Sequence, residues 1–175
     1  MVKKYKSLFI ILFIFSCNDA SNRFNKEEID YTNTPDQICY KMEFVFIDSN
    51  ITKTIINSQR ARVYNDRKET ILDEGVFVRF YNANGKQDGT LKADVINIDD
   101  ETKDMVAIGN VIVISDQSHT KLETSILNWK QQTRKITTDA YVKITAPTEI
   151  IEGIGLVSNE DLSNYTIYKV TGIKQ

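Results

Sequence analysis

The residues of this sequence that could carry chemistry are few and scattered. Four acidic side chains, Asp99, Asp100, Glu101 and Asp104, lie close enough together to suggest a calcium loop. An EF-hand loop also needs a central glycine and a distal glutamate at fixed positions, and this stretch has neither. We therefore interpret it as a solvated turn.

Nucleophilic catalysis and zinc binding have no better support. The chain has two cysteines and one histidine, His119, which sits in the polar stretch 115–120. No nucleophile motif surrounds any serine, and a zinc site needs more ligands than these. The stretch 153–155 (Gly-Ile-Gly) lacks the third glycine and the helix of a dinucleotide loop, so it predicts a bulge or a strand bend. We expect no catalytic residue, metal or cofactor, and interpret Cys39 as a half-buried thiol.

The charge balance argues against nucleic-acid binding. The 175 residues include 22 basic and 24 acidic side chains. Three of the basic ones, Lys3, Lys4 and Lys6, lie in the first segment, which carries no acid. Without that segment the chain is acidic, whereas nucleic-acid binders present a basic face.

The first 17 residues predict a secretory signal that ends at a lipidation site. The three lysines precede an apolar run, residues 8–15, which is far shorter than the ~20 residues of a membrane-spanning helix. The sequence Ile-Phe-Ser-Cys at 14–17 is similar to a bacterial lipobox, in which the cysteine is acylated. We expect Cys17 to anchor the protein in a membrane through its acyl chains. The alternative is an ordinary signal that is cleaved near Ser16.

The remaining chain is predicted to be a flexible tether followed by one β domain. Residues 18–38 are polar and aperiodic, so we assign 1–16 to the signal, 17–38 to the lipidated cysteine and tether, and 39–173 to the domain. From there short strands alternate with polar turns. The expected strands are 40–48, 55–64, 70–81, 91–98, 105–115, 122–129, 135–145, 150–157 and 165–173.

A weak internal repeat supports this architecture. Residues 91–114 and 122–144 align as two units of strand, polar turn and strand. Hairpins that cannot bury their own apolar face must stack on one another, as a sandwich, jelly roll or solenoid.

Four short motifs in this order resemble the LptC family of lipopolysaccharide export proteins. They are LKAD (91–94), IGNV (108–111), KITTD (135–139) and GIGL (153–156), behind an N-terminal anchor. The resemblance implies an all-β open jelly roll of two antiparallel sheets, built from stacked hairpins, whose apolar groove accepts the acyl chains of lipopolysaccharide. It also implies a periplasmic protein held at the inner membrane. Many family members use a transmembrane helix for this purpose, whereas this chain has the lipobox-like site.

Period-two alternation defines the face that would line such a groove. Ordinary sandwich packing explains the same pattern, and several strands are apolar on both sides. The expected lining residues are Phe44, Phe46, Leu72, Val76, Val78, Phe80, Leu91, Ala93, Val111, Val113, Leu122, Ile126, Ile136, Ala140, Val142 and Ile144.

The resemblance also implies two protein partners. The N-terminal edge strand would join the inner-membrane lipopolysaccharide ABC transporter, and the C-terminal edge strand would join an LptA-like bridge protein. Residues 40–47 and 164–173 contain no proline and few charges, as strand addition requires. Two alternatives stay open: an LptA-like bridge, or a structural β-repeat lipoprotein that takes no part in transport.

Overall fold

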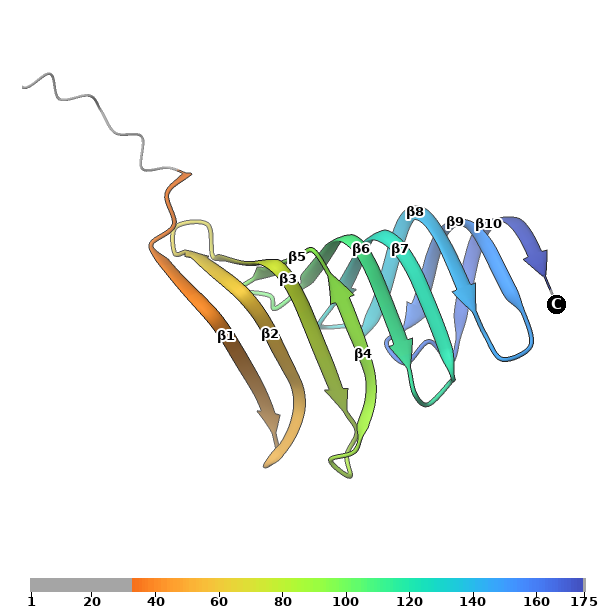
Figure 1. The fold of residues 1–175 in the computed structure, drawn as a ribbon, viewed down its shortest axis with the longest axis horizontal. Helices are drawn as coiled ribbons and strands as arrows, with labels where there is room; N and C mark the ends of the chain where they lie inside the picture. The colour runs from red at the N-terminus through yellow and green to blue at the C-terminus, as the bar shows by residue number, and fades with distance from the viewer. Residues whose placement is uncertain (1–32, 175) are drawn as a thin grey trace, which may run out of the picture. The chain divides into compact units, whose positions relative to one another are not determined.

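The structure, a computed structural model, describes residues 33–174, and Thr34 onward forms one all-β unit (Figure 1). The all-β prediction is confirmed, and this part of the chain contains no α-helix. The ten strands are β1 (Gln37–Asp48), β2 (Ile51–Tyr64), β3 (Glu69–Tyr81), β4 (Gln87–Ala93), β5 (Val95–Asp99), β6 (Met105–Ser115), β7 (Thr120–Lys130), β8 (Lys135–Thr145), β9 (Ile150–Asn159) and β10 (Tyr165–Lys174).

All ten strands belong to one antiparallel sheet. Its order is β1-β2-β3-β4-β6-β7-β8-β9-β10, and the short β5 pairs with β3 and β6 beside β4. Each strand therefore pairs with its neighbour in the chain, as expected for stacked hairpins, except that β4 and β5 both pair with β3 and β6 and not with each other. The two segments expected at the edges, in β1 and β10, are the terminal strands of the sheet.

The sheet bends near the middle of its strands and folds into two layers. Register shifts or positive φ angles occur there in most strands, for example at Glu74–Gly75 in β3 and Gly109–Asn110 in β6. Figure 1 shows the strands turning over into a second layer behind the first. The first layer contains residues 42–58, 76–93, 111–124 and 141–154, and the second contains residues 60–73, 95–108, 126–138 and 156–167. The two expected sheets are thus two layers of one continuous sheet.

Between β4, β5 and β6, hydrogen bonds of Asp94 with Gly109 and Asn110 hold the bend. Asp94 separates β4 from β5, and its backbone N–H donates to the Gly109 carbonyl at 2.9 Å. The Asn110 side chain donates to Asp94 Oδ2 at 2.8 Å. Gly109 has a φ of 77°, and a Cβ at this position would lie 2.3 Å from Asp94 Oδ2. Glycine is therefore the residue that this position favours, and the contacts of Asp94 with Gly109 and Asn110 bring the LKAD and IGNV motifs together at this corner.

The bend expected at 153–155 is confirmed, since Gly155 in β9 has a φ of 76°. Gly85 ends the β3–β4 turn with a φ of 73°. The predicted signal, Cys17 and most of the tether lie outside the described residues. No helix among residues 33–174 is long and apolar enough to cross a membrane.

Candidate functional site

A continuous row of apolar side chains crosses the inner face of the sheet from one edge strand to the other. Strand register places these residues opposite one another, one from every strand except β5. We call this set the central row. Its members are Phe44, Ile56, Val78, Leu91, Val113, Leu122, Ile144, Ile151 and Ile173.

The middle of the central row is buried in the core between the layers. Ile56, Leu122 and Ile144 have no exposed surface. They pack in one cluster with second-layer residues such as Leu72 and Leu156. In this structure the side chains of the protein fill the interior at the middle of the sheet.

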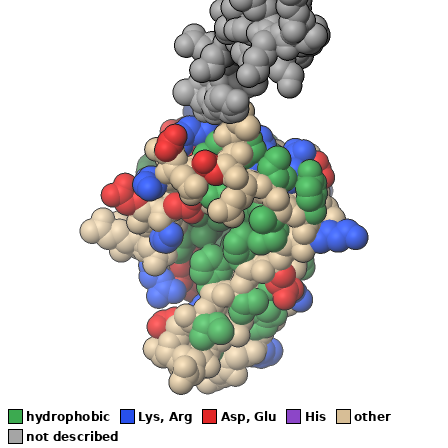
Figure 2. Space-filling view, turned by 90° about the vertical axis from the view of Figure 1, so that its left-hand side faces the viewer, with side chains coloured by type: hydrophobic (Ala, Val, Ile, Leu, Met, Phe, Trp, Pro, Cys, Tyr) green, Lys and Arg blue, Asp and Glu red, His purple; other side chains and the backbone are tan. Residues whose placement is uncertain are grey.

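The two ends of the row are more open. Figure 2 looks onto the β1 side of the sheet and shows apolar side chains gathered at the centre of that face, with charged groups toward its rim. At the other edge Ile173 is 62% exposed. The large exposed apolar side chains of β1 are Ile38, Tyr40, Val45, Phe46 and Ile47.

A second row on the same inner face lies nearer the ends of the first-layer strands, and we call it the tip row. Register joins Phe46, Thr54, Phe80, Gly89, Ser115 and Thr120 in this order. Phe46 and Phe80 are 41% and 36% exposed, whereas Ser115 and Thr120 are both 4% exposed. The inner face is therefore accessible at β1–β3 and closed at β6–β7.

Most of the sixteen predicted lining residues lie on this inner face. Phe44 and Leu91 are partly buried and pack against the core, and Ala140 is half-buried beside the bulge in β8. Phe46 and Phe80 are the exposed ones. The buried ones are Leu72, Val76, Val78, Ala93, Val111, Val113, Leu122, Ile136, Val142 and Ile144.

The face expected for Ile126 is corrected by the structure. A register shift between Thr124 and Asn128 in β7 reverses the alternation, so that Leu127 enters the core at 3% exposure. Ile126 instead pairs with Ile108, which is on the outer face. A bulge adds a residue to one strand only, and nothing in the local alternation reveals it.

Three central-row residues were not predicted from the sequence. Ile56 and Ile151 follow the alternation of their strands, and this pattern could have identified them. Ile173 sits beyond a register shift near Gly172, so only the pairing with β9 places it in the row.

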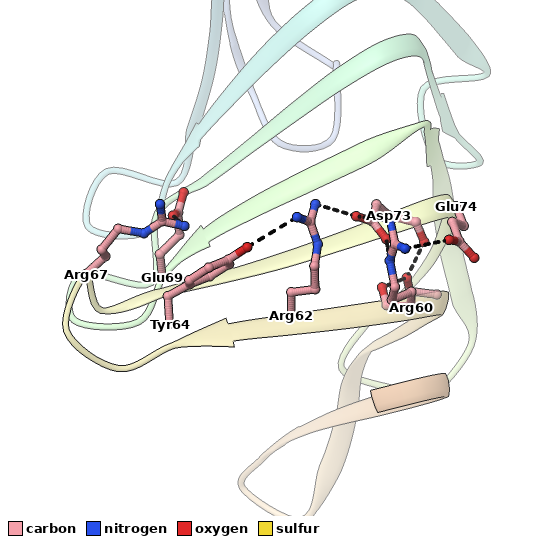
Figure 3. A network of polar contacts seen from close by, with 8 residues as sticks. Arg60, Arg62, Tyr64, Arg67, Glu69, Asp73 and Glu74 are labelled. Carbon is pink, nitrogen blue, oxygen red and sulfur yellow. Dashed lines mark hydrogen bonds and ion pairs between the residues drawn. The ribbon is translucent and has the colours of Figure 1, made fainter. Parts of the chain in front are cut away.

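The outer face carries a network of charges at the bend of β2 and β3 (Figure 3). Arg60 Nε donates to Asp73 Oδ1 at 2.7 Å, and Arg62 Nη2 donates to Asp73 Oδ2 at 2.5 Å. Arg60 also pairs with Glu74 at 2.9 Å. Ser58 Oγ donates to the Asp73 backbone carbonyl at 2.9 Å. These contacts hold β2 and β3 together where their register shifts.

The charges of this network stabilise the fold. Burial of the Asp73 carboxyl acts to raise its pKa, but hydrogen bonds from Arg60 and Arg62 outweigh that effect, and the pKa lies below its ordinary value. The carboxylate is therefore the favoured form. A carboxylate held by two guanidinium groups is neither a free base nor a free acid, so this network is no candidate for catalysis.

No other part of the described structure offers a better site. Among residues 33–174 no three metal-ligating side chains converge. A surface depression of about 470 Å³ lies between the β1–β2 and β3–β4 turns, where its lining includes Ile51, Ile55 and Tyr81. It is shared between polar and apolar groups and lies apart from the central row. The inner face therefore remains the candidate functional site.

A comparison with known protein families identifies the family to which this chain belongs. Residues 7–174 match the family described as lipopolysaccharide-assembly, LptC-related. The chain belongs to the LptC family. A search among curated proteins finds no match.

Membership in the LptC family assigns a role in lipopolysaccharide transport. Proteins of the LptC family are periplasmic, are associated with the inner membrane and work with the other components of the export machinery. They are transport components, which agrees with an apolar inner face as the main feature of the sheet.

Proposed function

We propose that this chain is a membrane-anchored periplasmic component of lipopolysaccharide export. It accepts lipopolysaccharide from the inner-membrane ABC transporter and passes it to an LptA-like bridge protein. The observation that carries this proposal is the central row, an apolar track that links one edge strand to the other.

The chemistry of the track suits acyl chains. Its members are aliphatic or aromatic, and burial of apolar surface contributes about 25 cal/mol per Å² removed from water. The transfer breaks no covalent bond, so it requires no catalytic residue, metal or cofactor. The same sixteen predicted residues, apart from Ile126, are our candidates for lipid contact.

The edge strands are suited to the two protein partners. β1 and β10 are the terminal strands of the sheet, and neither contains proline. Exposed strand edges pair readily with a strand of another chain. We assign β1 to the transporter and β10 to the bridge protein, so that the apolar tracks of successive proteins are continuous.

The anchor completes the proposal. Acylated Cys17, behind a signal of residues 1–16, would hold the domain at the membrane, because multiple acyl chains give stable attachment. The tether 17–38 then gives the domain of residues 39–173 freedom to meet both partners.

A photoreactive amino acid at Phe80 tests lipid binding directly. We expect adducts with lipopolysaccharide in cells, because Phe80 lies on the accessible part of the inner face. Ile114 is the matched control, since it is similarly exposed at 42% but lies on the outer face. Equal adducts at both positions, or none at Phe80, Leu72 and Ala140, would contradict the proposal and favour a purely structural role.

Charged substitutions in β10 test the second partner. We expect Tyr168→Lys combined with Ile173→Lys to weaken binding of an LptA-like partner at least tenfold, because lysine on an exposed edge opposes strand addition. Both side chains are more than 60% exposed, so the free energy of unfolding should change by less than about 0.5 kcal/mol. Ile114→Lys is the control away from the edge. Pull-down affinities and urea unfolding measure both effects, and unchanged binding would refute the role of β10.

A further inference from the structure

Among residues 33–174, a side-chain hydrogen bond joins the tips of the two layers of the sheet. Ser118 lies in the β6–β7 turn of the first layer, and Asp161 lies in the β9–β10 turn of the second. Ser118 Oγ donates to the Asp161 backbone carbonyl at 3.0 Å, although 43 residues separate them. Ser115 Oγ accepts from the Ser118 N–H at 3.2 Å and so orients this turn from inside.

Leu162 closes the same place from the second layer. It lies in a turn, yet it is 1% exposed and belongs to the core cluster. Its φ of 57° belongs to the turn, since Lys68, Lys103, His119 and Arg134 have similar φ values in other hairpin turns. Leu162 is therefore the apolar contact through which the β9–β10 turn joins the core.

Hydrogen bonds within the β9–β10 turn hold its residues together. Asn159 Oδ1 accepts from the Asn164 N–H at 2.9 Å, and Asp161 Oδ1 accepts from Ser163 N–H and Oγ at 2.9 and 2.8 Å. Ion pairing of Arg134 with Glu160 ties the turn to the β7–β8 turn of its own layer. The side-chain hydrogen bond from Ser118 joins this turn to the β6–β7 turn of the first layer.

The Ser118–Asp161 contact lies beside the part of the inner face that is closed to solvent. The tip row is accessible at Phe46 and Phe80 and closed at Ser115 and Thr120, beside the Ser118 turn. We infer that the β9–β10 turn with Leu162 is a latch, which joins the two layers as described here and parts from the β6–β7 turn when an acyl chain enters the interior between β6 and β9. This inference rests on the proposed lipid-binding function.

The distance between the two turns tests the latch. Gln117 and Glu160 are exposed, so nitroxide labels fit on cysteines at both positions in a full-length chain whose Cys17 and Cys39 are alanine. Pulsed EPR should show a shift to longer distances when purified lipopolysaccharide is added. A short bismaleimide that joins the same two cysteines should weaken lipopolysaccharide binding at least tenfold.

A second cysteine pair is the matched control. Gln132 and Glu160 lie in neighbouring turns of the second layer, so their distance should not change and their cross-link should leave binding intact. Unchanged Gln117–Glu160 distances, in a protein that still forms lipopolysaccharide adducts at Phe80, would refute the latch and leave the proposed function standing. Absence of adducts at Phe80 would instead remove the proposed function, and the latch with it.

Discussion

Replacement of Asp73 with alanine is expected to lower the free energy of unfolding by about 3 kcal/mol, because it removes two charge-assisted hydrogen bonds between β2 and β3. The Asp73 side chain is 7% exposed and accepts hydrogen bonds from both Arg60 and Arg62. Its removal leaves two guanidinium groups on one face of β2 with no carboxylate between them. Urea unfolding at neutral pH measures the change.

Glu74→Ala is the matched control for this network. Glu74 pairs with the same Arg60, but its side chain is half exposed, and exposed ion pairs contribute less than about 1 kcal/mol. Equal losses in the two variants would show that the burial of Asp73 contributes nothing to the strength of the contact.

The contribution of Asp73 should also depend on pH in one direction. Its pKa is lowered in the folded state by Arg60 and Arg62 against the effect of burial. A lowered pKa adds stability above the unfolded-state value, about 3.9, and this is lost as the pH falls through the folded-state value. The stability difference between the natural protein and Asp73→Asn should therefore be constant between about pH 7 and pH 5 and shrink below about pH 4. A difference that grows in acid would contradict this assignment.

The second large effect is expected at Gly109. Gly109→Ala should lower the free energy of unfolding by about 2–3 kcal/mol, since the residue has a φ of 77° and its new methyl group would collide with Asp94. The Asp94 side chain would have to move and lose its hydrogen bond to Asn110. Thermal or urea unfolding measures the loss.

Gly85→Ala separates the two causes. Gly85 has a similar φ of 73°, but no atom lies within 4 Å of a Cβ at that position. Its substitution should cost only the backbone strain, about 1 kcal/mol. If both variants lose the same stability, the contact with Asp94 makes no contribution at the bend.

Much of the strand pattern could be predicted from the sequence. Residues 105–115 and 135–145 are the strands β6 and β8 with the same bounds, because alternation and polar turns are local features. The expected strand 91–98 is divided at Asp94 into β4 and β5, since the break depends on contacts with Gly109 and Asn110.

The candidate site was likewise predicted where the sequence pattern is local and missed where it depends on contacts between distant residues. Alternation identified the buried faces of β3 and β8, where Leu72, Val78 and Ile144 enter the core. It failed for Ile126, because a bulge changes the face of every later residue in a strand. Nothing in the sequence around Leu162 marks a core residue, since it lies in a polar turn.

The sequence by itself determined the all-β class, the bounds of several strands and most of the inner face, because each depends on side-chain alternation and turn residues within a few positions. Tertiary structure decided the bend, the folding of one sheet into two layers and the Ser118–Asp161 contact. These depend on register shifts and on atoms brought together from distant parts of the chain. Whether the inner face is open or closed at each strand therefore depends on the folded sheet, and it cannot be predicted from the local sequence pattern.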